Sequence, residues 1–141
     1  AYFKKNKVII RNPYHTRPWQ HVLDPLNGYL LLIERSFIEL IYGGWNFGPS
    51  SKNEINVMSL AEICNQIISP DYNMLRILKT NTDFYESKYL KLDSSKIKKI
   101  IGWKNSLDIN KSIKWSLDWY LDRKTDYKTR TLKQIIDYSN L

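Results

Sequence analysis

The stretch from Arg17 to Leu32, RPWQHVLDPLNGYLLL, decides how the rest of the chain is interpreted. Asp24 can cap a helix with its carboxylate, and Pro25 suits the first helical position, where no intrahelical N–H is needed. Apolar side chains then recur at helical spacing, at Leu26, Tyr29, Leu30, Ile33, Phe37 and Ile41. The pattern predicts a helix that Asp24 caps and that Gly43-Gly44 ends.

Extended segments precede this helix. Val8, Ile9 and Ile10 form a short apolar run that predicts a strand, and the residues from Ala1 to Asn6 are interpreted as the end of a helix. Asn12-Pro13 predicts a turn, and a second extended piece runs from Arg17 to Val22. Because the first helix lacks its beginning and no initiator Met is present, we expect the chain to be a fragment of a longer protein.

Short strands and helices follow in irregular order. Strands are predicted at Trp45 to Pro49, which should end in a turn, at Met74 to Lys79 and at Tyr89 to Leu92. Helices are predicted from the capping box Ser59–Glu62 to Pro70, from Asp93 to Gly102, from Asp108 onward, and from the capping box Thr131–Gln134. The predicted fold class is α+β, mostly helical with a few short strands, without an independent parallel sheet.

Composition limits the possible classes of protein. A chain of 141 residues with 43% hydrophobic content suits one compact domain, residues 1–141. No apolar run approaches the ~20 residues of a membrane-spanning helix, and no secretory signal is apparent, so we expect no membrane partner. Cys64 is the only cysteine, which excludes a disulfide framework and fits a reducing cytoplasm. His15 and His21 lack the spacing of metal-binding pairs, so no metal ligand is predicted.

The net charge of +8 leaves one hypothesis of a different class open, a basic module that binds nucleic acid. Aromatic residues do alternate with lysines between Trp103 and Trp119. However, Trp115 and Trp119 recur at helical spacing on an apolar stripe, which favours core packing over base stacking. The leading hypothesis therefore includes no nucleic acid.

Two segments carry more polar and aromatic residues than simple alternation requires. Arg17 lies beside Pro18 and Trp19, on a stiff segment where a planar guanidinium could bind a phosphate. Residue chemistry is equally consistent with an Arg17 that stacks on Trp19 or pairs with Asp24. Asn46 could contact a ligand or bond its own backbone in a turn.

Several motifs together resemble CDP-glucose 4,6-dehydratases. They are Ile9-Ile10-Arg11-Asn12-Pro13, Arg17-Pro18-Trp19-Gln20-His21-Val22-Leu23-Asp24-Pro25-Leu26, Gly28-Tyr29-Leu30-Leu31-Leu32, Trp45-Asn46-Phe47-Gly48-Pro49, Glu86 before Tyr89-Leu90-Lys91-Leu92-Asp93, Gly102-Trp103 and Asp118-Trp119-Tyr120. The resemblance covers essentially the whole chain. It implies an extended short-chain dehydrogenase/reductase, whose N-terminal Rossmann half binds NAD and whose C-terminal half closes over the nucleotide sugar.

This chain resembles the C-terminal half. It contains no Gly-rich loop with dinucleotide-binding spacing, and four residues after Tyr85 stands Tyr89, not the Lys of the family's catalytic Tyr-x-x-x-Lys pair. We therefore expect no catalytic residue and no NAD binding in the chain itself. The resemblance implies that the complete enzyme is a bacterial homo-oligomer that uses NAD to convert CDP-glucose into CDP-4-dehydro-6-deoxy-D-glucose and water, with a link to O-antigen biosynthesis. A dTDP- or UDP-sugar dehydratase or epimerase is the alternative within the superfamily.

The resemblance also implies a set of substrate contacts. Arg17 matches the arginine that binds the pyrophosphate, and Asn46 matches an asparagine near the nucleotide. The backbone of Val8, Ile9 and Ile10 should lie along the base, and Tyr85 and Glu86 should close the pocket. Phe84-Tyr85 replaces the Pro-His that usually precedes that glutamate. We expect the strand ends at Val8–Ile10 and Trp45–Gly48 to lie side by side and to line one cleft with Glu86.

Overall fold

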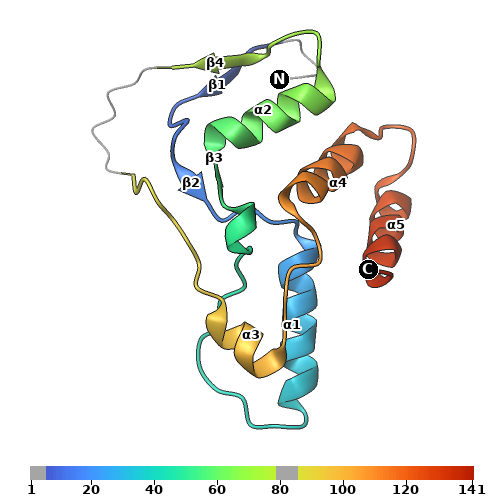
Figure 1. Ribbon diagram of the computed structural model, residues 1–141. Helices are drawn as coiled ribbons and strands as arrows, with labels where there is room; N and C mark the ends of the chain where they lie inside the picture. Colours follow the sequence, from blue (N-terminus) through green and yellow to red (C-terminus); the bar gives the residue numbers. More distant parts are fainter. Residues whose placement is uncertain (1–5, 79–85) are drawn as a thin grey trace.

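The structure is a computed structural model that describes residues 6–78 and 86–141 (Figure 1). Its elements in chain order are β1 (Val8–Ile10), β2 (Thr16–Arg17), α1 (Leu23–Ser36), the 3-10 turn η2 (Ser51–Asn53), β3 (Ile55–Asn56), α2 (Val57–Ile68), β4 (Leu75–Ile77), α3 (Ser95–Ile101), α4 (Ile109–Leu121) and α5 (Tyr127–Ser139). The α+β prediction, mostly helical with a few short strands, is confirmed. The helix expected between Ala1 and Asn6 falls largely outside the described residues.

The strands form two small pairs. β1 and β4 run parallel with Val8 opposite Leu75, and β2 and β3 run antiparallel with Arg17 opposite Ile55. The strand predicted at Val8–Ile10 is thus confirmed, and the one predicted at Met74–Lys79 is confirmed over Leu75–Ile77, with Lys79 outside the described residues. The one predicted at Tyr89–Leu92 is reduced to a single bridge between Tyr89 and Thr16. The parallel pairing in the described residues consists of the pair β1 and β4, which lies beside α2 at one end of the molecule (Figure 1), and of the isolated bridge between Tyr89 and Thr16.

Two predicted capping boxes are wrong. α2 begins at Val57, where the Asn56 side chain accepts a hydrogen bond from the Ser59 backbone N–H at 2.8 Å. In the same way, α5 begins at Tyr127, and Asp126 accepts from the Thr129 N–H at 3.0 Å. In both helices an Asn or Asp lies upstream of the expected box and caps the chain first, so the helix starts before the box.

Two other helix ends are as predicted. Asp108 caps α4 by accepting a 2.8 Å hydrogen bond from the Lys111 N–H. Gly102 ends α3 with a φ of 75°, a left-handed conformation that glycine adopts without steric cost. The Asp108 cap and the Gly102 terminator each depend only on neighbouring residues, and both helices begin or end where these residues predict. None of the helices within the described part of the chain combines the length and the apolar character that crossing a membrane would require.

Helix α1 differs from its prediction at both ends. Asp24 does not cap it, because Asp24 is fully buried in the first turn and its carboxylate accepts hydrogen bonds from distant residues. The helix stops at Ser36 instead of continuing to Gly43. Beyond it, Phe37 and Leu40 are 86% and 85% exposed. Since most helices in proteins are stabilised by packing, a segment with no packing partner gains little from remaining helical.

The segment Trp45–Pro49 is extended but is not a strand, which corrects the prediction. Its backbone groups bond to side chains. The Phe47 carbonyl accepts from Gln20 Nε2 at 2.6 Å, and the Gly48 N–H donates to Ser94 Oγ at 2.6 Å. No neighbouring strand within the described residues offers a ladder of backbone partners, and a strand needs such a ladder.

The core forms where this segment meets α1 and α3. Phe47, Ile97 and Trp103 are buried together, with the Phe47 and Trp103 rings edge to face at 5.2 Å. Trp103 is 2% exposed and is one of the most deeply buried side chains. A Cβ on Gly28 would lie 2.3 Å from the Phe47 ring. Only glycine therefore allows α1 to approach Phe47 this closely.

Candidate functional site

Four side chains form a polar cluster beside β2: Asn12, His15, Arg17 and Glu86. The Arg17 guanidinium pairs with one carboxylate oxygen of Glu86, and Asn12 Nδ2 donates to the other oxygen. His15 Nδ1 lies 3.4 Å from Arg17 Nη2 and 3.8 Å from Glu86 Oε2. The cluster thus assembles a guanidinium, an amide and an imidazole around one carboxylate.

Backbone contacts bring the two parts of the polar cluster together across 69 positions of sequence. The Thr16 N–H donates to the Lys88 carbonyl at 2.9 Å, and the Leu90 N–H donates to the Thr16 carbonyl at 3.2 Å. Arg17 Nη1 also donates to the Ser87 carbonyl at 3.0 Å. The segment that carries Glu86 is therefore held along β2, and Glu86 is delivered to Arg17 by tertiary structure.

The hydrogen bond from Arg17 is the main reason that the pKa of Glu86 lies below its usual value, and the bond from Asn12 acts in the same direction. Glu86 is therefore an anion at neutral pH. Its side chain is 52% exposed, whereas that of Arg17 is 19% exposed. An ion pair so open to solvent contributes little to folding stability, because water screens the attraction.

These contacts exclude one interpretation of Arg17, the pairing with Asp24, whereas phosphate binding stays a prediction. Its carboxylate partner is Glu86, which was itself predicted at the site, and not Asp24. The indole of Trp19 donates its N–H to the Ile55 carbonyl at 3.1 Å. Asn12 and His15 were missed as site residues. Asn12 was interpreted as a turn residue, and His15 was considered as a metal ligand and not predicted to be one; the proximity of both to Glu86 depends on the fold.

Strand β1, whose backbone is predicted to contact the base, forms hydrogen bonds to β4 along one of its edges. The Val8 N–H donates to the Met74 carbonyl at 2.8 Å, and the Ile10 carbonyl accepts from the Leu78 N–H at 2.9 Å. Ile10 is buried and Ile9 is 58% exposed. The edge of β1 away from β4 has no strand partner in the portion that the structure describes. The expectation that the backbone of Val8, Ile9 and Ile10 lies along the base stays a prediction.

Asn46 is exposed and lies between two residues that pack on the core, Trp45 and Phe47. The expectation that Trp45–Gly48 lies beside Val8–Ile10 is not met, because this segment packs against α1 and α3 while β1 lies at the other end of the molecule (Figure 1). Gln20, three residues after β2, donates to the Phe47 carbonyl. Tyr85 lies outside the described residues.

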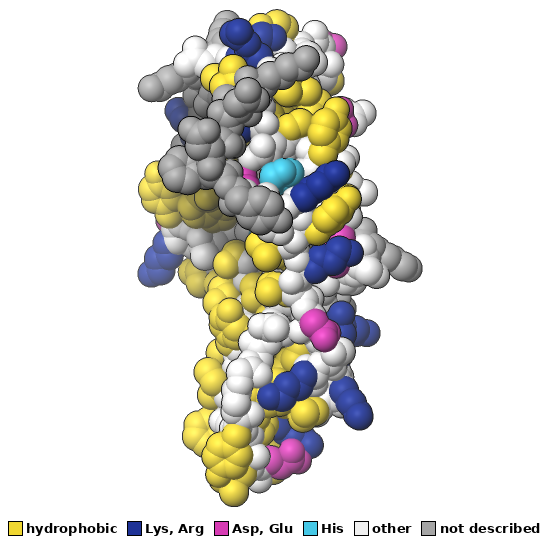
Figure 2. Space-filling view, turned by 90° about the vertical axis from the view of Figure 1, so that its left-hand side faces the viewer, with side chains coloured by type: hydrophobic (Ala, Val, Ile, Leu, Met, Phe, Trp, Pro, Cys, Tyr) yellow, Lys and Arg dark blue, Asp and Glu magenta, His cyan; other side chains and the backbone are white. Residues whose placement is uncertain are grey.

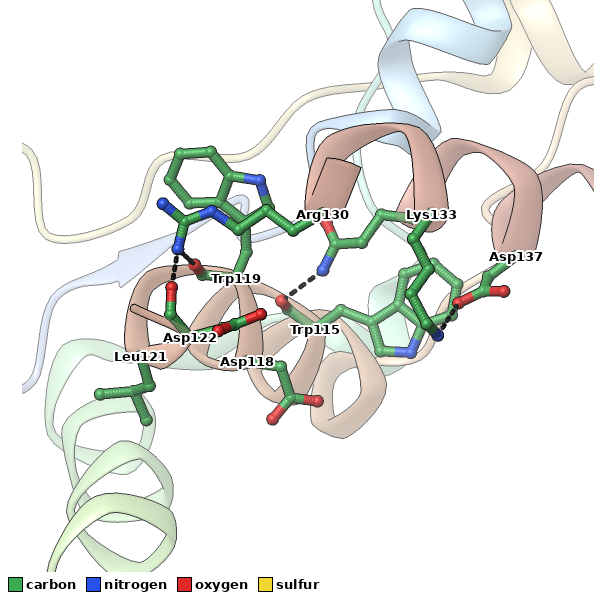
Figure 3. A pocket seen from close by; sticks show the side chains of 9 residues that line it. Trp115, Asp118, Trp119, Leu121, Asp122, Arg130, Lys133 and Asp137 are labelled. Carbon is green, nitrogen blue, oxygen red and sulfur yellow. Dashed lines mark hydrogen bonds and ion pairs between the residues drawn. The ribbon is translucent and has the colours of Figure 1, made fainter. Parts of the chain in front are cut away.

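A separate cavity of about 530 Å³ lies between α4 and α5 (Figure 3). The Arg130 guanidinium stacks over the Trp119 ring at 4.5 Å and over the Tyr127 ring at 4.4 Å. Lys133 pairs with Asp137 at 3.0 Å on the same wall. The ring of Trp119 is therefore engaged by other side chains of the chain, and this arrangement does not favour the nucleic-acid hypothesis.

Comparison with known proteins gives one curated relative of high similarity. The CDP-glucose 4,6-dehydratase of Salmonella typhimurium is 35% identical over 143 residues, which cover 96% of this chain and 39% of that enzyme. The chain is homologous to the C-terminal part of that enzyme, and the resemblance predicted from the sequence is confirmed. The chain spans about two fifths of the length of this relative. No family model matches the chain.

Solved structures share the fold at lower identity. The dTDP-glucose 4,6-dehydratase of Bacillus anthracis, solved with NAD, matches with a TM-score of 0.71 at 14% identity, over 91% of this chain and 39% of that one. The UDP-glucuronic acid 4-epimerase of Bacillus cereus, solved with UDP-glucuronic acid and NAD, matches with a TM-score of 0.65 at 17% identity, over 79% and 34% of the two chains. At such identities the likeness shows the fold alone.

Proposed function

We propose that this chain is the nucleotide-sugar-binding portion of an NAD-dependent CDP-glucose 4,6-dehydratase. The complete enzyme would convert CDP-glucose into CDP-4-dehydro-6-deoxy-D-glucose and water. The observation that carries the proposal is the 35% identity to the Salmonella enzyme across 96% of this chain. Assembly of Arg17 and Glu86 into one polar cluster supports it, since the resemblance places both residues at the substrate.

In this proposal Arg17 binds the pyrophosphate of the substrate. Its planar guanidinium offers two parallel donors that match phosphate oxygens. Glu86 would hold the guanidinium in place before the substrate arrives, and Asn12 would orient Glu86 in turn. The backbone of Val8, Ile9 and Ile10 would lie along the base. Asn46 and Tyr85 are proposed contacts at the edges of the same substrate.

The chain's own residues leave the chemical step to another part of the enzyme. The sequence contains no Gly-rich loop of dinucleotide-binding spacing. A Tyr-x-x-x-Lys spacing occurs at Tyr120 and Lys124, but α4 ends at Leu121 between them and Tyr120 is 69% exposed, so we do not assign these residues as a catalytic pair. We therefore assign NAD, and the hydride transfer that it supplies, to an N-terminal Rossmann half. The same half would provide the catalytic residues and the contacts of a homo-oligomer. Incubation of the chain alone with CDP-glucose and NAD should leave the substrate unchanged.

The test uses a chimera in which this chain replaces the corresponding part of the Salmonella typhimurium enzyme. Calorimetry would compare CDP-glucose, dTDP-glucose and UDP-glucose on the wild-type chimera and on the Arg17→Ala and Arg17→Lys variants. We expect Arg17→Ala to weaken CDP-glucose binding by about 1.5–3 kcal/mol, typical of a hydrogen bond to a charged group. Arg17→Lys should restore only part of the loss, because a point charge lacks the two-pronged geometry.

Arg35→Ala is the matched control. Arg35 lies near the end of α1 and forms a surface ion pair with Glu39, which follows the helix. It should leave CDP-glucose affinity unchanged. Equal affinity in the Arg17 variants and the wild type would show that Arg17 is structural. Tighter binding of dTDP-glucose or UDP-glucose than of CDP-glucose would favour the alternative within the superfamily.

A further inference from the structure

Both terminal nitrogens of the Arg17 guanidinium are engaged by acceptors within the chain. Nη1 donates to the carbonyls of Thr16 at 2.8 Å and of Ser87 at 3.0 Å. Nη2 donates to Glu86 and lies 3.4 Å from His15 Nδ1, which is the longest of these contacts. A phosphate bound by Arg17 would have to compete with one of these acceptors. His15 is the easiest to displace, because hydrogen bonds weaken as they lengthen.

The protonation of His15 decides whether this acceptor exists at all. An imidazole nitrogen can accept a hydrogen bond from Arg17 only while it carries no proton, because both ring nitrogens of an imidazolium are donors. Protonation would therefore free one N–H of Arg17 for a phosphate oxygen. Glu86 would stabilise the imidazolium, since its Oε2 lies 3.8 Å from His15 Nδ1. Histidine is the side chain whose charge commonly changes between pH 5 and pH 8.

The net charge of the polar cluster also depends on His15. Arg17 and Glu86 carry opposite charges and Asn12 is neutral, so the cluster has no net charge while His15 is neutral. The hydrogen bond from Arg17 lowers the pKa of Glu86, which keeps this carboxylate ionised where histidines titrate. Protonation of His15 would thus give the cluster one net positive charge. A diphosphate carries negative charge on both phosphates and would be attracted to it.

The backbone of His15 is held on both sides, which fixes where the imidazole lies. Its N–H donates to the Asn12 carbonyl at 3.3 Å, and its carbonyl accepts from the Val57 N–H, at the start of α2, at 3.0 Å. In the part of the chain that the structure describes, the charged groups that face the ring are Arg17 from β2 and Glu86 from the segment beside β2. The side chains of His15 and Arg17 are each 19% exposed, so both stay partly accessible.

The basic side chains of the described residues are distributed over the surface. On the face shown in Figure 2, Lys and Arg side chains are spread among polar and apolar ones. Because salt screens distant charges, attraction for a diphosphate must come mainly from the polar cluster itself. We propose that His15 is a second diphosphate-binding residue, whose imidazolium form joins Arg17 at the substrate and tightens nucleotide-sugar binding as the pH falls. This inference rests on the proposed function and adds a pH dependence to its site.

The experiment measures CDP-glucose binding to the chimera by calorimetry between pH 8 and pH 6. Both phosphates of CDP-glucose are esterified, so the charge of the ligand is constant over this range. We expect the affinity to rise by about fivefold as the pH falls, because a nearby opposite charge typically favours the charged form of a side chain by about tenfold or more. His15→Gln should bind like the wild type at pH 8 and should show no rise.

His21→Gln is the matched control, because it removes the other histidine of the chain, which is buried, and should keep the pH profile. Circular dichroism would establish that each variant is folded at pH 6. A second measurement needs no variant. Near pH 7 the wild-type chimera should take up a fraction of a proton for each CDP-glucose bound, which calorimetry in two buffers of different ionisation heat detects.

The outcomes separate this proposal from the proposed function. CDP-glucose binding with an affinity independent of pH would overturn the role of His15 alone, and so would a pH profile that His15→Gln retains. dTDP-glucose and UDP-glucose carry the same diphosphate, so either should show the same profile if it binds. Binding of one of these two without CDP-glucose would refute the proposed function alone. Failure of all three to bind at any pH would overturn both proposals.

Discussion

Two carboxylates, Asp24 and Glu86, each join segments that are far apart in the sequence, and they do so in opposite surroundings. Asp24 is fully buried at the start of α1, where it accepts from the Ser106 N–H at 2.8 Å and from the Tyr138 hydroxyl at 2.8 Å. Glu86 is about half exposed and pairs with Arg17. Burial, with the carboxylate of Asp24 beside it, raises the pKa of Tyr138 to about 12.

The comparison teaches which region stabilises the protein and which is open to a ligand. A buried acceptor whose donors have little access to water is costly to remove, because those donors lose their partner. An exposed ion pair is screened by water and contributes little to folding. We therefore expect the hydrogen bonds of Asp24 to hold together three parts of the molecule: helix α1, the loop that precedes α4, and helix α5. The polar cluster around Glu86 should instead matter mainly when substrate is bound.

Removal of the buried carboxylate should have the largest effect. Asp24→Ala is expected to lower the free energy of unfolding by about 2–4 kcal/mol, because the Ser106 N–H and the Tyr138 hydroxyl both lose a charged acceptor. Urea unfolding followed by circular dichroism would measure it. Asp24→Asn keeps one acceptor oxygen and should cost less. A stability loss no greater for Ala than for Asn would contradict the role given to the carboxylate.

Loss of one donor from the same network should cost less. Tyr138→Phe removes the hydroxyl that bonds Asp24 and keeps the ring, so we expect a loss of about 1–2 kcal/mol. Tyr120→Phe is a suitable control, since Tyr120 is 69% exposed on α4. In the Asp24→Ala background the Tyr138 change should have almost no further effect. Additive losses in the double variant would mean that the two residues act independently.

The pH dependence of stability should report on His21, a buried neighbour of Asp24. Burial lowers the pKa of His21, and Asp24 opposes that shift only in part. The folded protein then binds fewer protons than the unfolded chain below about pH 6.5. Stability is therefore full above this pH and falls as the pH drops through the folded-state pKa. Thermal melts between pH 7.5 and pH 5 should show the fall, and a His21→Gln variant should have a flatter profile.

The smallest effect on stability is expected at the exposed carboxylate. Glu86→Gln should leave the melting temperature of the chain unchanged, because the pair with Arg17 is open to solvent. The same substitution in the chimera should weaken CDP-glucose binding, since Arg17 would lose the group that positions it. A melting temperature that falls as far as that of Asp24→Ala would remove the distinction between the two regions.

Local patterns predicted several features of the fold because only a few neighbouring residues decide them. The apolar run Val8–Ile10 is a strand, Asp108 caps α4 and Gly102 ends α3. The two capping boxes were wrong for a related reason, since Asn56 and Asp126 were equally good caps a few residues earlier. Choosing between competing local signals requires knowledge of where each helix must begin to pack.

By itself, the sequence determined the α+β class, the resemblance to the dehydratase family and Arg17 and Glu86 as candidates, because short-range patterns and motifs carry that information. Only the tertiary structure decided that these two residues meet, that Asn12 and His15 join them, and that Asp24 is a buried acceptor and not a helix cap. Those contacts connect positions separated by 69 to 114 residues. No local periodicity encodes them, since they form only when helices and strands pack together and burial determines which polar groups must find partners.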